Sequence, residues 1–274
     1  MGRAMKILRS NISPAVQRGF SLVELMVALL LGSLIVIAAT QLFITNQRTF
    51  QLQQGLTDIQ EQGRFALDFV ARDLRRTGLR QPDFVGGPDV GIELNALTVN
   101  GQNFPASSEG GGDNAANDRL TFSFHGNAGD QDCEGSTLSA AAAPARIVNT
   151  YWVNNQSELM CRGSIDAGTN SIAIVSGVDS FQVLYGVDTN EDGVPFASRY
   201  VRADQLAPAD PVVTVRIGLL VRATQGNLPE LADPVDFIVL DKLVEAGSAP
   251  LDVAAVRRLF ITTVRARNYT WESI

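Results

Sequence analysis

The sequence has 274 residues, of which 45% are hydrophobic and 19% charged, a composition typical of a folded protein with length for one or two domains. Its formal net charge is −7. Residues 1–19 contain four basic side chains and no acidic one, so the rest of the chain is more acidic than the total indicates. A protein that binds nucleic acid needs a basic face to neutralise phosphates. The acidic main body therefore argues against direct nucleic-acid binding.

An apolar segment follows the basic N-terminus. No charge occurs between Leu25 and Gln47, a stretch long enough for a helix to cross a hydrocarbon layer of roughly 30 Å. The basic residues ahead of it predict a cytoplasmic N-terminus and a body on the other side of the membrane. A secretory signal has a small-residue cleavage site after its apolar core, and no such site follows here. We therefore expect the segment to remain as an anchor, although the carboxylate of Glu24 directly precedes its uncharged part.

The residues Gly19-Phe20-Ser21-Leu22-Val23-Glu24-Leu25 resemble the class III signal of type IV pilins and of the related pseudopilins of type II secretion. The resemblance implies that a prepilin peptidase cuts between Gly19 and Phe20 on the cytoplasmic side and methylates the new N-terminus at Phe20. Residues 1–19 would then be a cleaved leader peptide. Residues 20–44 would be the transmembrane half of a long N-terminal helix.

Glu24 is the unusual residue of this anchor, because a charge inside a bilayer is costly and usually marks function. The resemblance implies a partner for it, the free α-amino group of Phe20 in a neighbouring subunit. Pairing two buried charges offsets much of their desolvation, so the pair would set the axial register during filament assembly. The alternative is that the Glu24 side chain reaches out to the lipid headgroups near the helix end.

The helix is expected to continue to Thr77, because no proline occurs between Pro14 and Pro82. Residues 45–79 form the predicted amphipathic half, which ends at a glycine cap, Gly78. Its apolar positions recur at three- and four-residue steps, at Leu56, Ile59, Gly63, Ala66, Val70 and Leu74.

Residues 80–274 predict a β-rich globular domain in the periplasm. Short β-prone runs alternate with turn signals and no strand-helix alternation occurs, which favours an α+β protein with mainly antiparallel sheet packed on the helix. This is also the type IV pilin fold that the resemblance implies. The predicted strands are Arg119–Phe124, Ile147–Val153, Phe181–Tyr185, Val212–Val221, Phe237–Leu240 and Leu259–Val264.

Two further regions, Arg64–Gly78 and Arg257–Asn268, resemble PilW-type minor pilins. That resemblance implies a minor pilin that primes pilus assembly and moves from the inner membrane into the pilus, at its tip. The implied partners are other minor pilins, the major pilin, a PilY-type tip adhesin and the prepilin peptidase. One alternative is a J-type minor pseudopilin at the tip of a type II secretion pseudopilus. Another is a binding module that uses the loops Ser107–Asn117 and Asp188–Gly193.

The two cysteines, Cys133 and Cys161, predict one disulfide, because the body is expected in an oxidising compartment. It would close a loop of roughly 28 residues and stabilise the fold by about 3 kcal/mol in the chain-entropy description.

A possible calcium loop begins at Asp188. Asp188, Asn190 and Asp192, followed by a glycine, match the opening of an EF-hand loop. The twelfth position should supply a carboxylate and is Arg199, so a polar turn between two strands is the competing interpretation.

No pattern in the sequence predicts an enzyme. His125 is the one histidine, it has no nucleophile motif beside it, and its place predicts an exposed residue at a strand end. The sequence contains neither a P-loop nor a dinucleotide-binding fingerprint.

Overall fold

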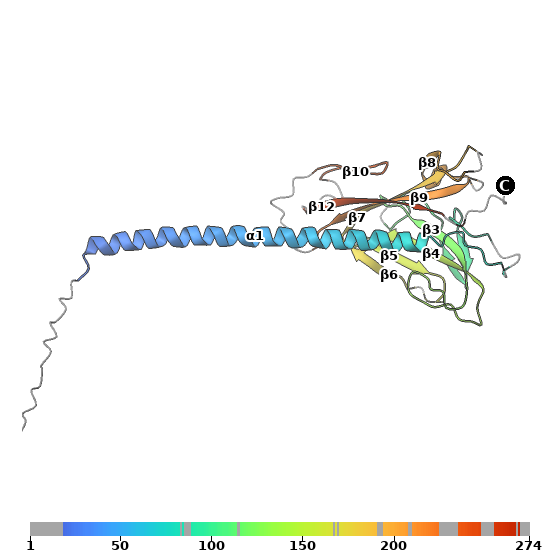
Figure 1. Ribbon diagram of the computed structural model, residues 1–274, viewed down its shortest axis with the longest axis horizontal. Coiled ribbons are helices and arrows are strands. Elements are labelled where there is room, and N and C mark those ends of the chain that lie inside the picture. Colours follow the sequence, from blue (N-terminus) through green and yellow to red (C-terminus); the bar gives the residue numbers. More distant parts are fainter. Residues whose placement is uncertain are drawn as a thin grey trace, which may run out of the picture. The chain divides into compact units, whose positions relative to one another are not determined.

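The computed structural model describes residues 19–82, 84, 89–113, 116–166, 168, 170–190, 194–207, 210–224, 235–247, 255–266 and 268. The predicted leader, apart from Gly19, therefore lies outside the described residues. The chain forms two units, residues 1–48 and 49–274, and each is considered by itself. Figure 1 shows the helix and strands with the labels used below.

One long helix, α1, extends from Leu22 to Leu74, slightly less at both ends than predicted. After Leu74 the backbone tightens, because the N–H groups of Arg76 and Thr77 bond to carbonyls three residues earlier, both at 3.0 Å. Gly78 follows with a φ of 74°, the left-handed conformation in which glycine ends helices. The predicted glycine cap is confirmed.

The second unit contains two antiparallel four-stranded sheets and two short hairpins among its described residues. The first sheet has the order β3-β4-β5-β6: Leu120–Gly126, Ala145–Val153, Glu158–Gly163 and Ile172–Ser176. The second has the order β12-β9-β7-β8: Arg257–Arg265, Val212–Arg222, Val178–Val187 and Arg199–Val201. The hairpins are β1-β2, Leu97–Val99 with Gln102–Phe104, and β10-β11, Phe237–Val239 with Lys242–Val244. A 3₁₀ turn occupies Ala203–Gln205. The predicted α+β class is confirmed.

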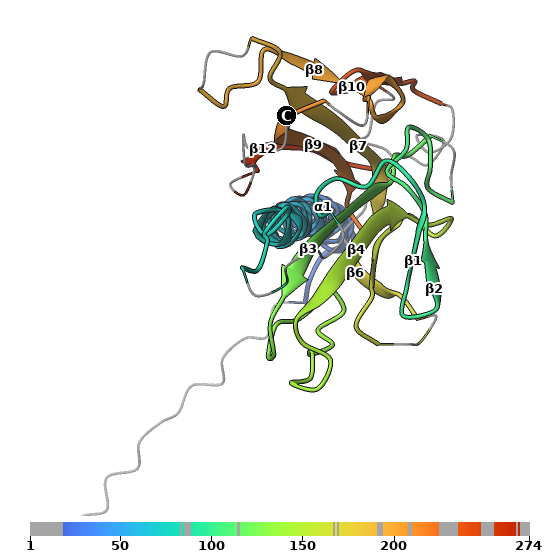
Figure 2. The ribbon, with the colours of Figure 1, turned by 90° about the vertical axis from the view of Figure 1, so that its right-hand side faces the viewer.

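The part of α1 in the second unit packs against both sheets, and Figure 2 shows the helix between them. Its buried side includes Gly55, Ile59, Gly63, Ala66, Val70 and Leu74. The predicted apolar stripe is correct except at Leu56, which is exposed because Gly55, one residue earlier, faces the core. Burial of the large side chains on this stripe stabilises the unit by about 1.5–3 kcal/mol each.

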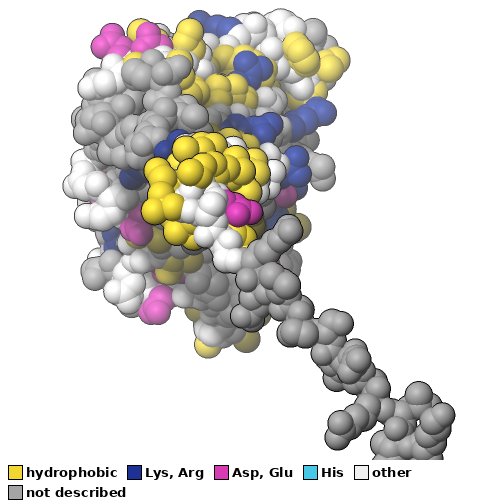
Figure 3. Space-filling model, turned by 90° about the vertical axis from the view of Figure 1, so that its left-hand side faces the viewer, with side chains coloured by type: hydrophobic (Ala, Val, Ile, Leu, Met, Phe, Trp, Pro, Cys, Tyr) yellow, Lys and Arg dark blue, Asp and Glu magenta, His cyan; other side chains and the backbone are white. Residues whose placement is uncertain are grey.

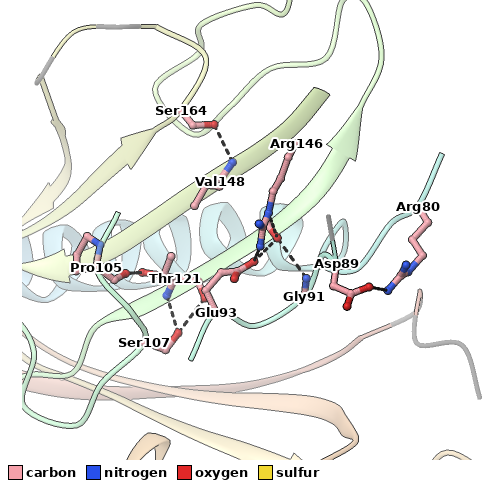
Figure 4. Close-up of polar contacts among 11 residues, drawn as sticks. Arg80, Asp89, Gly91, Glu93, Pro105, Ser107, Thr121, Arg146, Val148 and Ser164 are labelled. Atoms are coloured by element: carbon pink, nitrogen blue, oxygen red, sulfur yellow. Dashed lines mark hydrogen bonds and ion pairs between the residues drawn. The ribbon is translucent and has the colours of Figure 1, made fainter. Parts of the chain in front are cut away.

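Parts of segment 89–108 lie along the outer edge of β3 and are held there by backbone bonds and by polar side chains on one face of that strand (Figure 4). Glu93 accepts hydrogen bonds from Ser123 and Arg146. The Ser107 hydroxyl donates to the Thr121 carbonyl and accepts from the Thr121 N–H, both at 2.9 Å. Buried polar groups have to be hydrogen-bonded, so this network specifies one position for the segment.

His125 lies on the same face of β3 and is only 2% exposed, so the prediction of an exposed residue was wrong. The Gln81 N–H donates to its Nδ1 at 3.4 Å, and the ring of Phe84 meets it edge-on at 4.8 Å. The covering segment comes from sequence far from β3, which is why strand position alone did not reveal the burial.

The two sheets are joined where residues 116–118 meet β7. The Asn117 side chain accepts a bond from the Phe181 N–H at 2.7 Å, and the Asp118 carboxylate accepts from the Val183 N–H at 2.8 Å and the Gly110 N–H at 3.1 Å. Burial raises the pKa of the Asp118 carboxyl to about 7, and the negative charges of Glu109 and Asp241 add to that effect.

This shift predicts that stability depends on pH through Asp118. The pKa of Asp118 is higher in the folded state, about 7, than its ordinary value of 3.8, so the folded protein binds the extra proton between these values. The free energy of unfolding contributed by this group is therefore greatest below about pH 4 and falls by up to about 1.4 kcal/mol per pH unit toward pH 7. Urea unfolding of the wild-type chain and of Asp118→Asn at several pH values measures this slope.

Asp118→Asn should lose part of the pH dependence while other buried carboxyls retain theirs. The Asn side chain also changes two hydrogen bonds, which shifts the stability by an amount that does not depend on pH. The slope is therefore the readout, and an identical slope in both proteins would contradict the assignment to Asp118.

Candidate assembly site

The N-terminal end of α1 is capped by Ser21. The Ser21 hydroxyl accepts a hydrogen bond from the Glu24 N–H at 3.1 Å, and the Ser21 carbonyl accepts from the Leu25 N–H at 3.1 Å. This is the arrangement of a helix N-cap, and the Ser-x-x-Glu spacing is that of a capping box. The motif was present in the sequence and was overlooked there, because the same residues had been assigned to the peptidase signal.

The cap gives Glu24 a second physical role. Its carboxylate lies in the first turn of α1, where the helix dipole favours a negative charge. Glu24 is exposed, and it forms no ion pair with any described residue of its own chain. Gly19 and Phe20 directly precede the cap and are exposed as well. The two halves of the implied charge pair therefore lie at the same end of α1, and both are accessible to another subunit.

The described part of the first unit, residues 19–48, presents a largely apolar surface. Its helix is long and apolar enough to cross a membrane: the most apolar window has a mean hydropathy of 2.6, and none of that window is buried. Figure 3 looks along the helix from its N-terminal side and shows mostly hydrophobic side chains around it. Exposed apolar side chains of this extent mark a lipid- or protein-facing surface.

The few hydroxyl side chains on this surface are satisfied within the helix. Ser33 donates to the Leu30 carbonyl at 2.8 Å, and Thr40 donates to the Val36 carbonyl at 2.8 Å. An unsatisfied polar group in hydrocarbon costs several kcal/mol, so these internal bonds reduce the cost of placing this helix in lipid.

In the second unit, α1 is attached to the β12-β9 side of the domain. The Asp58 carboxylate accepts bonds from the N–H and hydroxyl of Thr224, at 3.2 and 2.9 Å. One turn later Gly63 lies against the ring of Phe260, where a Cβ atom would be only 2.3 Å from a ring carbon. A side chain at this position would force the Phe260 ring to move.

The last turn of α1 is attached to β4 through a buried carboxylate. Asp73 is 5% exposed and forms an ion pair with Arg76, as the helical spacing predicts. It also accepts bonds from the Asn149 amide at 2.6 Å and the Tyr151 hydroxyl at 2.7 Å. Burial, and then the neighbouring Asp73 charge, raise the pKa of Tyr151 well above its ordinary value, so this hydroxyl stays protonated and remains a donor.

The disulfide lies beside this attachment. Cys133 and Cys161 are bonded, with their Cα atoms 6.2 Å apart, and the predicted pairing is confirmed. The Cys133 N–H donates to the Asn149 side-chain oxygen at 3.2 Å, and the other end of the same amide bonds to Asp73. The cystine therefore supports a polar chain that runs from β4 to the helix.

The possible calcium loop is described only in part. Asp192 lies outside the described residues, whereas Asp188 is buried and its carboxylate accepts N–H bonds from Asn190 at 3.2 Å and from Phe196 at 3.3 Å. Such bonds are typical of a polar turn. Among the described residues no group of acidic, histidine or cysteine side chains could hold a metal ion. Calcium binding here stays a prediction, and a thermal melt with and without chelator would test it.

The matches to known families agree with these features. Residues 15–40 match the prokaryotic N-terminal methylation motif, and residues 148–268 match the family described as type IV pilus-assembly protein W, or PilW. These two matches support a type IV pilin of the PilW family. The PilW match extends from β4 to Asn268, which follows β12, and thus includes most strands of both sheets. The description of the matched family is that of a protein of pilus assembly.

Among solved structures, a type IV-like pilin from Thermus thermophilus is similar to this chain. The identity is 16% and the TM-score 0.39, and the similarity covers 81% of this chain and 98% of that one. No curated protein matches the sequence.

Proposed function

We propose that this protein is a minor pilin that primes assembly of type IV pili and is incorporated into them. The observation that carries the proposal is the methylation motif directly ahead of a capped, fully exposed apolar helix, in a chain whose sheets match PilW. Residues 1–19 are removed after Gly19 and Phe20 is methylated. Residues 20–44 then hold the protein in the inner membrane with its N-terminus in the cytoplasm.

The remaining chain lies in the periplasm in this proposal, with residues 45–79 as the helical spine and residues 80–274 as the globular domain. The attachments of α1 at Asp58, Gly63 and Asp73 support these separate roles for the helix and the globular domain, because they join the helix to both sheets. Force on the helix would then be transmitted to the domain through its core. The subunit later leaves the membrane for the pilus, at its tip.

Glu24 guides that transfer. In the membrane or the filament core, its carboxylate pairs with the α-amino group of Phe20 in a neighbouring subunit. Coulomb attraction is strong in a low dielectric, and an unmatched buried charge is costly, so only the correct register is stable. The exposed positions of both groups at the start of α1 support the pairing.

The partners in this proposal are other minor pilins, the major pilin, a PilY-type tip adhesin and the prepilin peptidase. The J-type pseudopilin of type II secretion is the alternative, since the N-terminal motif is common to both systems. The PilW match over residues 148–268 favours the pilus.

Mass spectrometry of the N-terminal peptide separates these possibilities. Sheared surface filaments and inner-membrane fractions are analysed side by side. A methylated N-terminus at Phe20 in the filaments is the expected result. The same peptide confined to the membrane would favour the pseudopilin, and any other N-terminus in both fractions would contradict the processing itself.

A further inference from the structure

The outer edge of strand β12 is the longest strand edge left unpaired in the described part of the chain. β12 is the terminal strand of its sheet and pairs with β9 along all nine of its residues, without a register shift. Of the other terminal strands, β8 and β6 have three and five residues, and β3 has seven but is covered by other backbone. An uncovered edge of this length is a template for another strand.

Other strand edges in the domain are covered by its own backbone. Beside β3, the Glu93 N–H bonds to the Thr121 carbonyl at 2.9 Å and the Ser123 N–H to the Gly91 carbonyl at 2.8 Å. Beside β7, where β8 does not reach, the Asp118 N–H bonds to the Phe181 carbonyl at 2.9 Å. No described segment covers the outer edge of β12 in this way. Within the described part of the chain, the other long edges are thus covered by backbone and this one is not.

The hydrogen bonds at the two ends of β12 show which of its groups point outward. The Ala223 N–H donates to the Val256 carbonyl and the Ala266 N–H donates to the Val213 carbonyl, both at 2.9 Å. Hydrogen-bonded pairs alternate along an antiparallel ladder, so the even-numbered residues of β12 bond to β9. The N–H and C=O groups of Leu259, Ile261 and Thr263 consequently point away from β9.

The side chains along this edge indicate what kind of strand would fit. Ile261 is 51% exposed and Thr263 is exposed, whereas Arg258 and Arg265 are exposed near the two ends. If two copies of β12 paired antiparallel about Ile261, each Arg265 would lie opposite the Arg257 of the other copy. Like charges at cross-strand positions destabilise a sheet, so a second copy is a poor partner. An added strand with acidic residues toward both ends would instead be attracted.

We propose that the outer edge of β12 binds an extended segment of another protein subunit by strand addition, and that this segment is β-branched or apolar in its middle and acidic at both ends. Backbone hydrogen bonds to Leu259, Ile261 and Thr263 supply affinity, and Arg258 and Arg265 select for charge. The inference rests on the proposed function, because the partner is sought among subunits that assemble with this chain.

Hydrogen exchange of the full-length chain tests the geometry. In the detergent-solubilised chain alone, the amides of Ile261 and Thr263 should exchange at least about tenfold faster than those of Phe260 and Thr262, which bond to β9. In the complex isolated from the membrane, Ile261 and Thr263 should become at least about tenfold slower. Amides that remain fast in a complex that has formed would overturn the proposal.

A matched pair of substitutions tests the contact in cells. Thr263→Pro and Thr263→Val both remove the hydroxyl, which accepts a bond from Arg216 at 3.3 Å, but only proline removes the outward N–H. Thr263→Pro should lower the amount of this chain in sheared filaments at least about tenfold relative to Thr263→Val. Since proline could also disturb β12 itself, the double variant Arg258→Glu, Arg265→Glu provides a second test and should show a similar loss.

Cross-linking mass spectrometry on the wild-type complex identifies the segment beside β12. A β-prone segment of another subunit with acidic ends is expected, and a second copy of this chain would overturn the proposal. Equal incorporation of the proline and valine variants, with normal incorporation of the double variant, would also overturn it. Absence of the wild-type chain from filaments would instead contradict the proposed function.

Discussion

Glu24→Ala should be processed and inserted normally but should be at least about tenfold depleted from sheared filaments, because removing one partner of a buried ion pair costs about 3–5 kcal/mol. The cost arises because the α-amino group of Phe20 in the next subunit would be left without a counter-charge. Glu24→Gln, which keeps the size of the side chain but not its charge, should behave in the same way. Quantitative mass spectrometry of membrane and filament fractions measures the ratio.

The capping role of this region provides the control. Ser21→Ala removes the hydroxyl that accepts the Glu24 N–H bond and should cost about 1 kcal/mol of helix stability, while the carboxylate is retained. If Glu24 acted only by favouring the start of the helix, Ser21→Ala would reduce incorporation as much as Glu24→Ala. Normal piliation in Glu24→Ala would contradict the pairing altogether.

Removal of the disulfide should produce the largest loss of stability in the globular domain. We expect Cys133→Ala with Cys161→Ala to lower the free energy of unfolding by about 3 kcal/mol, since the unfolded chain regains the freedom of the closed loop. The two sulfur atoms are also buried, so their loss removes packing as well. Urea unfolding of the processed protein in detergent measures the difference.

The position of the cystine predicts where the loosening appears. Because Cys133 supports Asn149 and Asn149 supports Asp73, amides near the end of α1 should exchange faster in the double variant. Asn149→Ala, with the disulfide intact, provides the comparison because it breaks the same polar chain at its middle. A change in unfolding free energy below about 1 kcal/mol in the cysteine variant would mean that the fold does not depend on this cross-link.

The attachments of α1 also explain why a PilW-type domain needs polar groups in its core. Asp73, Asn149 and Tyr151 are buried at the point where the helix ends and would cost stability if left unpaired. Each has a partner that comes from a different element. Apolar packing alone tolerates sliding of a helix along a sheet, whereas this directional set specifies one axial position.

The sequence predicted the features that depend on local patterns. The apolar segment, the helix from the leader toward Thr77, the glycine cap at Gly78 and the Cys133–Cys161 pairing all follow from neighbouring residues or from simple counting. Helix periodicity is a local property, and α1 continues over so many residues that an error of two or three at each end matters little. The six predicted strand regions correspond to strands for the same reason.

Short strands were harder to predict. β5 has the sequence Glu158–Gly163 with charges at two positions, and β6, β1, β2 and β11 have five residues or fewer, so their periodicity carries little information. They form strands because a neighbouring strand bonds to each of them: β4 to β5, β5 to β6, and each hairpin strand to its partner. That contribution comes from residues distant in sequence.

The sequence by itself therefore determined the apolar anchor segment, the long helix and the fold class, because each is encoded by adjacent residues. It also predicted the assembly motif at Phe20 and Glu24. Only the tertiary structure decided that His125 and Asp118 are buried, that Asp73 attaches α1 to β4, and that no described segment covers the outer edge of β12. The physical reason is that burial and edge pairing depend on which distant segments pack together. Those contacts exist only after the two sheets have assembled around the helix.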